Sequence, residues 1–187
     1  MAVDSIRWTV QDLNAMPDDG GWKRYETINE ELIVTRAPHA WHQGCANRLS
    51  TQLEIWADES GLGRVFQAPG VILSGYNAII PDVIWISTDR LANGLDEAGH
   101  FIVAPELMVE VLSAGERNEQ RDQNVKLKLY SLYGVQEYWI ANWRLKQIEL
   151  YRRQNARLVL AATLVVGDSL SSPLLPGFSC GIARIFR

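Results

Sequence analysis

Four short apolar segments constrain the fold of this 187-residue chain more than any other feature of its sequence. They read RVFQA, GVILS, PDVIWIS and ELMVEVLS, and glycine or proline separates them. Short segments rich in Val and Ile are typical of strands that are buried on both faces of a sheet. A sheet of this kind needs helices on both sides, so the rest of the chain has to supply them.

Three segments have helical character. Over residues 40–60 the apolar positions recur at helical spacing, and Gly61 stands where a helix C-cap is expected. A second helix is expected over residues 118–133. A short helix is expected over residues 9–16, where Thr9 and Asp12 have the spacing of a capping box.

The remaining segments predict further strands. WKRYETI and ELIVTRA flank Asn29 and Glu30 as the two strands of a hairpin would. EYWIAN, QIELYRR and RLVLAAT are predicted strands, and PGFSCGIARIF is predicted to be a loop followed by a short helix. Helices embedded among strands, without regular β-α-β alternation, indicate an α/β (α+β) protein with a mixed β-sheet flanked by helices. We expect one domain over residues 1–187, with residues 1–21 as an N-terminal helical extension.

Composition excludes several classes of protein. Apolar residues make up 47% and charged residues 21% of the chain, which is close to the globular average. No run approaches the roughly 20 apolar residues that span a bilayer, and the N-terminus lacks a signal-peptide pattern, so we expect a cytoplasmic protein without membrane contact. The net charge of −4 argues against a protein that coats nucleic acid. Cys45 and Cys180 belong to no zinc-binding or disulfide pattern.

Two carboxylates lie inside the apolar segments. Asp82 follows Pro81 and precedes VIWIS, and Glu110 interrupts LMVEVL. Burying a carboxylate is costly unless it is paired, hydrogen-bonded or bound to a metal. Taken singly, Asp82 fits a turn and Glu110 fits a solvent-facing edge position. Together in neighbouring strands they also fit a site for Mg²⁺ or Mn²⁺, which prefer oxygen ligands.

Lysine is the residue that would complete such a site, because an ammonium group orients the attacking water and offsets charge in the transition state. Lys126 is spaced to share one face of the second helix with Asp122 and Tyr130. A surface Asp–Lys pair that stabilises the helix is the alternative explanation. Lys128 points elsewhere on that helix.

The order of these segments resembles that of a known family. PDVIWIS, PELMVEVLS, RDQNVKLKLY and YGVQEYWI follow one another as in the Uma-type restriction endonuclease family, long catalogued as a domain of unknown function. That family belongs to the PD-(D/E)xK nuclease superfamily. The resemblance extends to ETINEELIV and to His42 and Gln43 at the start of the long helix, and so covers nearly the whole chain.

The resemblance implies a restriction-endonuclease-like fold and metal-dependent cleavage of DNA. Asp82 and Glu110 correspond to the metal-binding carboxylates, Lys126 to the catalytic lysine and Glu31 to a further acidic residue of the catalytic site. The implied cofactor is Mg²⁺ or Mn²⁺. The usual superfamily pattern places the lysine two residues after the second acid, where this chain has Leu112.

Several interpretations stay open at this stage. His42 is expected either to contact substrate or to cap the helix, and Ser113 either to position Glu110 or a water, or to cap a turn. Trp41 and Trp143 fit stacking on a base and ordinary packing equally well. A homodimer would suit cleavage of both strands of a duplex. The alternative function is that of a non-catalytic nuclease-fold binding or scaffold protein.

Overall fold

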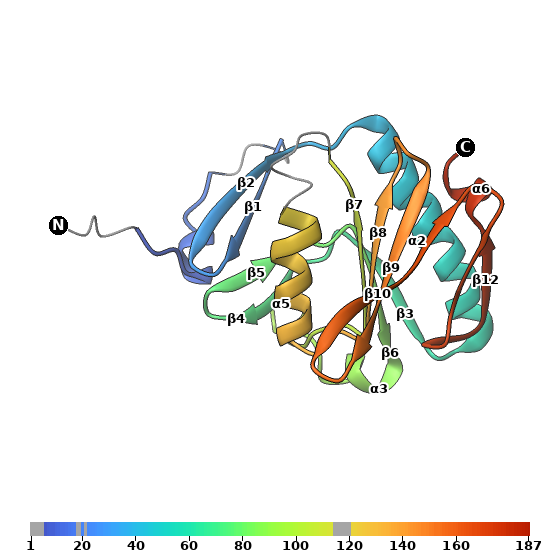
Figure 1. Cartoon of the computed structure of the whole chain (residues 1–187). Helices are drawn as coiled ribbons and strands as arrows, with labels where there is room; N and C mark the ends of the chain where they lie inside the picture. The colour runs from blue at the N-terminus through green and yellow to red at the C-terminus, as the bar shows by residue number, and fades with distance from the viewer. Residues whose placement is uncertain (1–5, 18–19, 21, 114–120) are drawn as a thin grey trace.

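A six-stranded sheet runs through the middle of the computed structural model, which describes residues 6–17, 20, 22–113 and 121–187 (Figure 1). Its strand order is β10-β9-β8-β7-β6-β3. Strands β7 and β8 pair in parallel, and every other neighbouring pair is antiparallel, so the mixed sheet expected from the sequence is confirmed. The strands are β3 (Gly63–Gln67), β6 (Val83–Ser87), β7 (Leu107–Val111), β8 (Glu137–Asn142), β9 (Gln147–Gln154) and β10 (Arg157–Val165).

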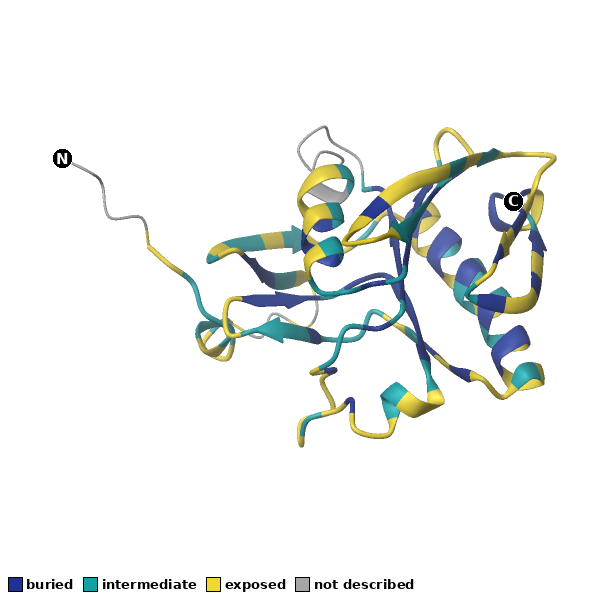
Figure 2. Cartoon of the chain, turned by 60° about the horizontal axis from the view of Figure 1, so that its bottom comes forward, coloured by how far each residue is buried: buried dark blue, intermediate teal, exposed yellow. Residues whose placement is uncertain are grey.

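Helices cover both faces of this sheet (Figure 2). On one face, α2 (Ala40–Ser60) packs the side chains of Leu49, Leu53 and Trp56 against the sheet. On the other face, α5 (Leu127–Leu132) contributes Leu129 and Tyr130 to a second apolar cluster. The central strands are therefore buried on both sides, which is why their sequences lack polar alternation.

Local signals explain where the helices begin and end. Helix α2 ends at Gly61, which adopts the left-handed conformation with φ of 67° that a helix C-cap favours. The second predicted helix is present from residue 121, first as a π-helix, η1 (Arg121–Lys126), and then as α5; residues 118–120 lie outside the described part. Among the described residues, no helix has the length and apolar character needed to span a membrane.

A smaller four-stranded sheet lies beside the central one, with the order β2-β1-β5-β4. Its hairpin turn is the predicted Asn29-Glu30 pair, and both residues have positive φ, as a two-residue turn requires. The short helix α1 (Val10–Leu13) begins at the predicted capping box of Thr9 and Asp12. The strands are β1 (Lys23–Ile28), β2 (Glu31–Arg36), β4 (Val71–Ser74) and β5 (Asn77–Ile79), the last of which the sequence did not predict.

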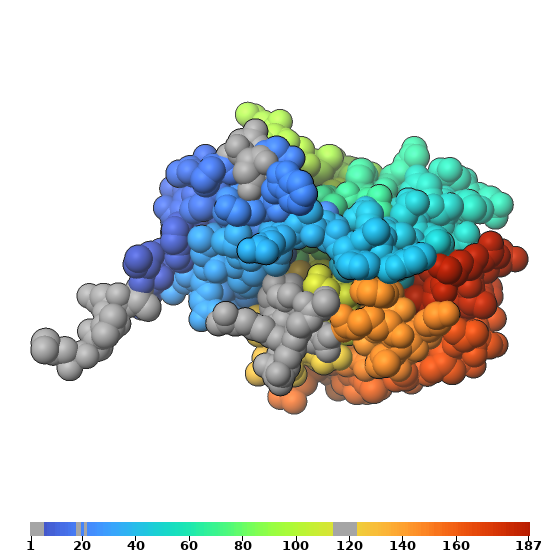
Figure 3. Space-filling model, turned by 90° about the horizontal axis from the view of Figure 1, so that it is seen from above, coloured from blue at the N-terminus to red at the C-terminus, as the bar shows by residue number. Residues whose placement is uncertain are grey.

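The C-terminal segment corrects one prediction. Much of the expected loop is strand β12 (Leu175–Gly181), which pairs with β11 (Ser169–Ser172) and leads into the expected short helix, α6 (Ile182–Ile185). Leu175, Phe178 and Cys180 are buried in the apolar cluster beneath α2. This burial stabilises a strand whose glycine and proline content is typical of a loop. The remaining element is α3 (Thr88–Leu91). Seen from above, the start of α2 lies between the N-terminal strands and the C-terminal segment (Figure 3).

Candidate active site

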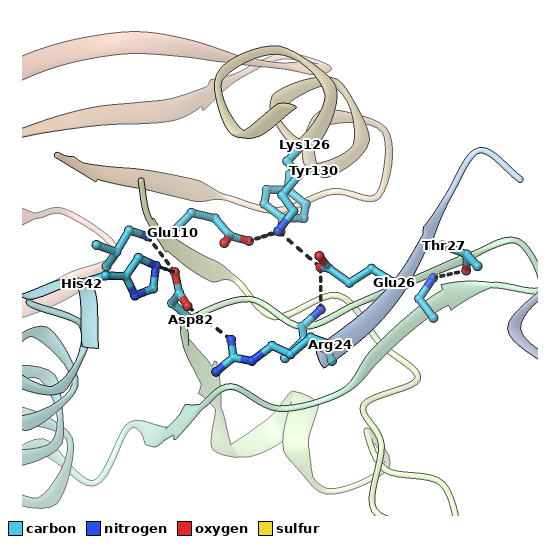
Figure 4. Close-up of polar contacts among 11 residues, drawn as sticks. Arg24, Glu26, Thr27, His42, Asp82, Glu110, Lys126 and Tyr130 are labelled. Atoms are coloured by element: carbon cyan, nitrogen blue, oxygen red, sulfur yellow. Dashed lines mark hydrogen bonds and ion pairs between the residues drawn. The ribbon is translucent and has the colours of Figure 1, made fainter. Parts of the chain in front are cut away.

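Three carboxylates and one ammonium group meet in a hollow where the two sheets approach each other (Figure 4). Glu26 comes from β1, Asp82 from the position just before β6, Glu110 from β7 and Lys126 from the end of η1. All four are buried, with exposed fractions of 2–7%. The hollow has a volume of about 40 Å³. Because one water needs roughly 10–15 Å³ by this measure, the hollow holds a few water-sized groups.

Glu110 and Lys126 form the shortest ion pair of the site. Lys126 Nζ lies 2.7 Å from Glu110 Oε1, and the Tyr130 hydroxyl donates to the same oxygen over 2.8 Å. Burial, together with the negative charge of Glu110, raises the pKa of Tyr130 well above its usual value. Tyr130 therefore stays protonated and remains a hydrogen-bond donor to the carboxylate.

Lys126 also connects Glu110 to the smaller sheet. Its Nζ lies 3.3 Å from Glu26 Oε1, so the ammonium group lies between two buried carboxylates. The same Glu26 oxygen accepts a hydrogen bond of 2.9 Å from the backbone N–H of Ile80, two residues before Asp82. Glu26 thus holds both the lysine and the turn that leads into Asp82.

Asp82 is held by three groups. Its Oδ2 accepts a hydrogen bond of 2.8 Å from the backbone N–H of Val111 and lies 3.2 Å from His42 Nε2. Its Oδ1 lies 3.6 Å from a guanidinium nitrogen of Arg24. Burial by itself would raise the pKa of Asp82, but the hydrogen bond and charge of His42, the Val111 N–H and the charge of Lys126 together lower it. Asp82 is therefore a carboxylate at neutral pH.

His42 belongs to the site rather than to the helix cap. It lies in the first turn of α2, 3% exposed, while His39 performs the capping role by accepting the backbone N–H of Trp41 on Nδ1. With His42 Nε2 directed at Asp82, its Nδ1 is buried and has no hydrogen-bond partner within the described part of the chain. Such an atom invites a water or a substrate group.

Glu31 is not in the site, which corrects the prediction drawn from the family resemblance. It begins β2 at the tip of the hairpin and is exposed. Strand β2 is the edge strand of the smaller sheet, whereas β1 is an inner strand that pairs with β2 along one edge and with β5 along the other. The acidic residue that reaches the hollow is therefore Glu26 on β1, opposite Ile33.

The structure also shows why the lysine comes from a helix. Leu112, at the usual lysine position, is 1% exposed and packs in the apolar cluster beneath α5. The ammonium group comes instead from Lys126 at the end of η1, 2.7 Å from Glu110 Oε1. Ser113 is half-buried and lines the hollow, and the Asp122 side chain lies outside the described residues.

Glu26 and Arg24 are the residues of the site that the sequence analysis missed. The available signal was the one that singled out Glu110, namely a carboxylate in the middle of a predicted strand. In the KRYETI segment, alternation places Arg24, Glu26 and Ile28 on one face, and Ile28 is buried at 2% exposure. Two charged residues on the same strand face as a buried isoleucine indicate a polar site next to the core.

The family model Uma2, described as "Putative restriction endonuclease", matches residues 10–183. The chain belongs to this family. The fold of this Uma2-family chain is similar to that of "a putative nuclease belonging to DUF820 from Anabaena variabilis", with a TM-score of 0.74 and 16% identity over 96% of this chain and 97% of that one. The expected fold class is thereby confirmed. A type IIG restriction endonuclease, BpuSI, is a more distant structural match, with a TM-score of 0.42 and 14% identity over 78% of this chain and 15% of that one. No curated protein matches the sequence.

The carboxylate oxygens of this Uma2-family site are the type of ligand that a hard divalent cation prefers. Carboxylate oxygens of Asp82 and Glu110 line one hollow, and Mg²⁺ is usually held by one or two carboxylates together with water and substrate phosphate. Their present neighbours are the cations Lys126 and Arg24 and the imidazole of His42. Among the described residues, no three His, Cys, Asp or Glu side chains lie close enough together to form a metal cage.

Proposed function

We propose that this Uma2-family protein is a metal-dependent endonuclease that hydrolyses phosphodiester bonds in DNA. The observation that supports the proposal best is the convergence of Glu26, Asp82, Glu110 and Lys126 from four separate elements on one hollow. Burying charged groups is costly unless they are paired or functional, and a carboxylate with a shifted pKa in a hollow, as Asp82 is, is typical of active sites.

Asp82 and Glu110 are the residues that would hold Mg²⁺ or Mn²⁺. When bound, a divalent cation polarises the scissile phosphate and lowers the pKa of a coordinated water. The residues around Asp82 keep it ready for this role. Its lowered pKa leaves it charged, and the Val111 N–H and His42 fix its direction.

Lys126 is the residue that would act on the attacking water. Its ammonium group lies within 2.7 Å of Glu110 and 3.3 Å of Glu26, so two carboxylates position it beside the proposed metal ligands. From there it would donate a hydrogen bond to the water and offset the negative charge that develops on the phosphate. Glu26 and Tyr130 are positioning residues that hold Lys126 and Glu110.

The first test is cleavage of supercoiled plasmid by the native chain with Mg²⁺ or Mn²⁺ and with EDTA. We expect nicked and linear products with either metal, none with EDTA and none from Asp82→Asn. A homodimer, which remains a prediction, would favour linear over nicked products. Absence of cleavage with both metals on supercoiled, linear and single-stranded DNA would contradict the proposal.

A second test separates metal binding from catalysis. Millimolar Mn²⁺ should raise the melting temperature of the native chain and not of Asp82→Asn, because a ligand that binds only the folded state stabilises it. At a concentration one hundred times the Kd, the expected gain is about 2.7 kcal/mol. Equal shifts in both chains would show that the metal binds elsewhere.

A non-catalytic nuclease-fold binding protein is the second candidate. It is favoured by the charges of the site, because the cations Lys126 and Arg24 already lie beside the buried carboxylates without a metal ion. The net charge of −4 is also unusual for a protein that binds DNA over a large surface. If the native chain shows neither a metal-dependent shift in melting temperature nor cleavage of DNA, the non-catalytic binding function is the better supported one.

A further inference from the structure

A second and larger depression lies next to the candidate active site, between the start of α2, the turn that joins β8 to β9, and the C-terminal segment. It has a volume of about 460 Å³, within the range of roughly 300–1,000 Å³ typical of ligand sites. We call it the basic groove. Figure 3 looks down on the face where these three segments meet.

The charge of the basic groove is opposite to that of the chain as a whole. The residues that line it include Arg48, Arg144, Lys146 and Arg187, and none of its described lining residues is acidic. The chain as a whole has a net charge of −4. A local concentration of cations on an acidic protein favours an anionic ligand.

Two tryptophans give the groove its aromatic character, and they differ in exposure. Trp143 is half-buried, stacks on His39 with ring centroids 5.1 Å apart and lies beneath the Arg144 guanidinium at 5.7 Å. Trp41 is 58% exposed, although an indole ring is costly to leave in water. Trp41 is therefore the ring that remains available to a ligand, and Trp143 forms part of the floor.

Both tryptophans of the groove connect it to residues near the candidate active site. Trp41 is adjacent in sequence to His42, whose Nε2 lies 3.2 Å from Asp82. The Trp143 indole N–H donates a hydrogen bond of 3.1 Å to the backbone oxygen of Leu112, two residues after Glu110.

We propose that the basic groove binds an unpaired nucleotide of single-stranded DNA, with its base stacked on Trp41 and its phosphates near Arg48, Arg144 and Lys146. The inference rests on the proposed function, because it names single-stranded DNA as the substrate of the proposed nuclease. Aromatic side chains beside a basic path are the usual means of binding single strands, because every base has a π-face. In a duplex the base faces are stacked on one another and are closed to Trp41.

The proposal is tested by binding without cleavage. A fluorescein-labelled oligothymidine in EDTA reports affinity by anisotropy. We expect Trp41→Ala to weaken binding about tenfold, because base–aromatic stacking contributes much of the affinity for a single strand. Trp41→Phe should retain most of the affinity. Tyr76→Ala, at a 50% exposed aromatic in the β4–β5 turn, is the matched control and should bind as the native chain does.

Two further measurements complete the test. Base stacking should quench the tryptophan fluorescence of the native chain, and the quenching should shrink in Trp41→Phe. Arg144→Gln should weaken binding and reduce its dependence on salt, because a phosphate contact releases counterions. Melting curves of each variant verify that the exposed positions leave the fold intact.

The outcomes distinguish this proposal from the proposed function. Glu110→Gln should lose cleavage and keep oligothymidine binding. If the native chain cleaves no DNA but binds oligothymidine more tightly than Trp41→Ala does, the endonuclease proposal is contradicted and the groove proposal is supported. If the native chain cleaves DNA but the native chain and Trp41→Ala bind oligothymidine with equal affinity, the groove proposal is overturned. Tighter binding of a blunt duplex than of the single strand would also overturn it.

Discussion

Two buried glutamates on neighbouring strands show what separates a candidate catalytic carboxylate from a structural one. Glu110 on β7 and Glu137 on β8 are 4% and 3% exposed, and each is paired with a cation. Glu137 Oε1 lies 3.0 Å from Arg152 Nε, and its Oε2 accepts a hydrogen bond of 2.9 Å from the Trp139 indole. By burial and charge alone the two residues are equivalent.

Their partners and positions differ. Arg152 lies directly opposite Glu137 on β9 and Trp139 lies two residues along the same strand, so Glu137 is paired within one sheet. Glu110 is paired with residues from the helical segment and lines a hollow with two further carboxylates. Because β7 and β8 run in parallel, the start of β8 and the end of β7 lie at opposite ends of the sheet. Convergence of distant elements, rather than burial, identifies the candidate site.

Catalysis provides the sharpest test of this difference. Glu110→Gln keeps the shape of the side chain and removes the charge that would bind metal, so we expect plasmid cleavage to fall by at least about a hundredfold. Glu137→Gln should retain most of the native rate. Equal losses in the two variants would mean that both glutamates act only through stability.

The second prediction concerns the cations. Lys126→Met leaves Glu26 and Glu110 buried without their shared counter-charge, and breaking a buried pair in this way costs about 3–5 kcal/mol. Urea unfolding of the native chain and the variant measures the difference. Glu110→Gln should relieve part of the loss in the double variant, and strict additivity of the two changes would contradict the coupling.

Arg152→Met tests the structural pair by the same measurement. Arg152 is 33% exposed, and after its loss Glu137 keeps its hydrogen bond from Trp139. We expect a smaller destabilisation, about 1–3 kcal/mol, and unchanged cleavage by the folded fraction. A loss as large as that of Lys126→Met would remove the energetic distinction between the two pairs.

The smallest expected effect is on the acid side of the stability profile. The pKa of Asp82 is lowered by folding, so Asp82 contributes stability above its unfolded pKa of about 3.9, and this contribution is lost as the pH falls through the folded value. Stability measured between pH 6 and pH 3 should therefore fall more steeply in the native chain than in Asp82→Asn. Parallel profiles would show that Asp82 has the same pKa in both states.

Much of the local structure was predictable from the sequence. Helix α2, its end at Gly61 and the Asn29-Glu30 turn all follow from periodicity and turn chemistry, which act over a few residues. Strands β5 and β12 were not predictable in this way. Strand β5 has only three residues, and β12 contains glycine and proline and is stabilised by its packing beneath α2.

The sequence by itself identified Asp82, Glu110 and Lys126 as candidate site residues. Carboxylates within apolar strands, and a lysine on the same helix face as Tyr130, can be recognised from residue spacing alone. Only the tertiary structure decided that Glu26 rather than Glu31 joins them, that His42 faces Asp82, and that Trp41 lies above a basic groove. The reason is that strand order and register determine which side chains share a hollow. Glu26 and Lys126, for example, are 100 positions apart, and no local periodicity records such a pairing.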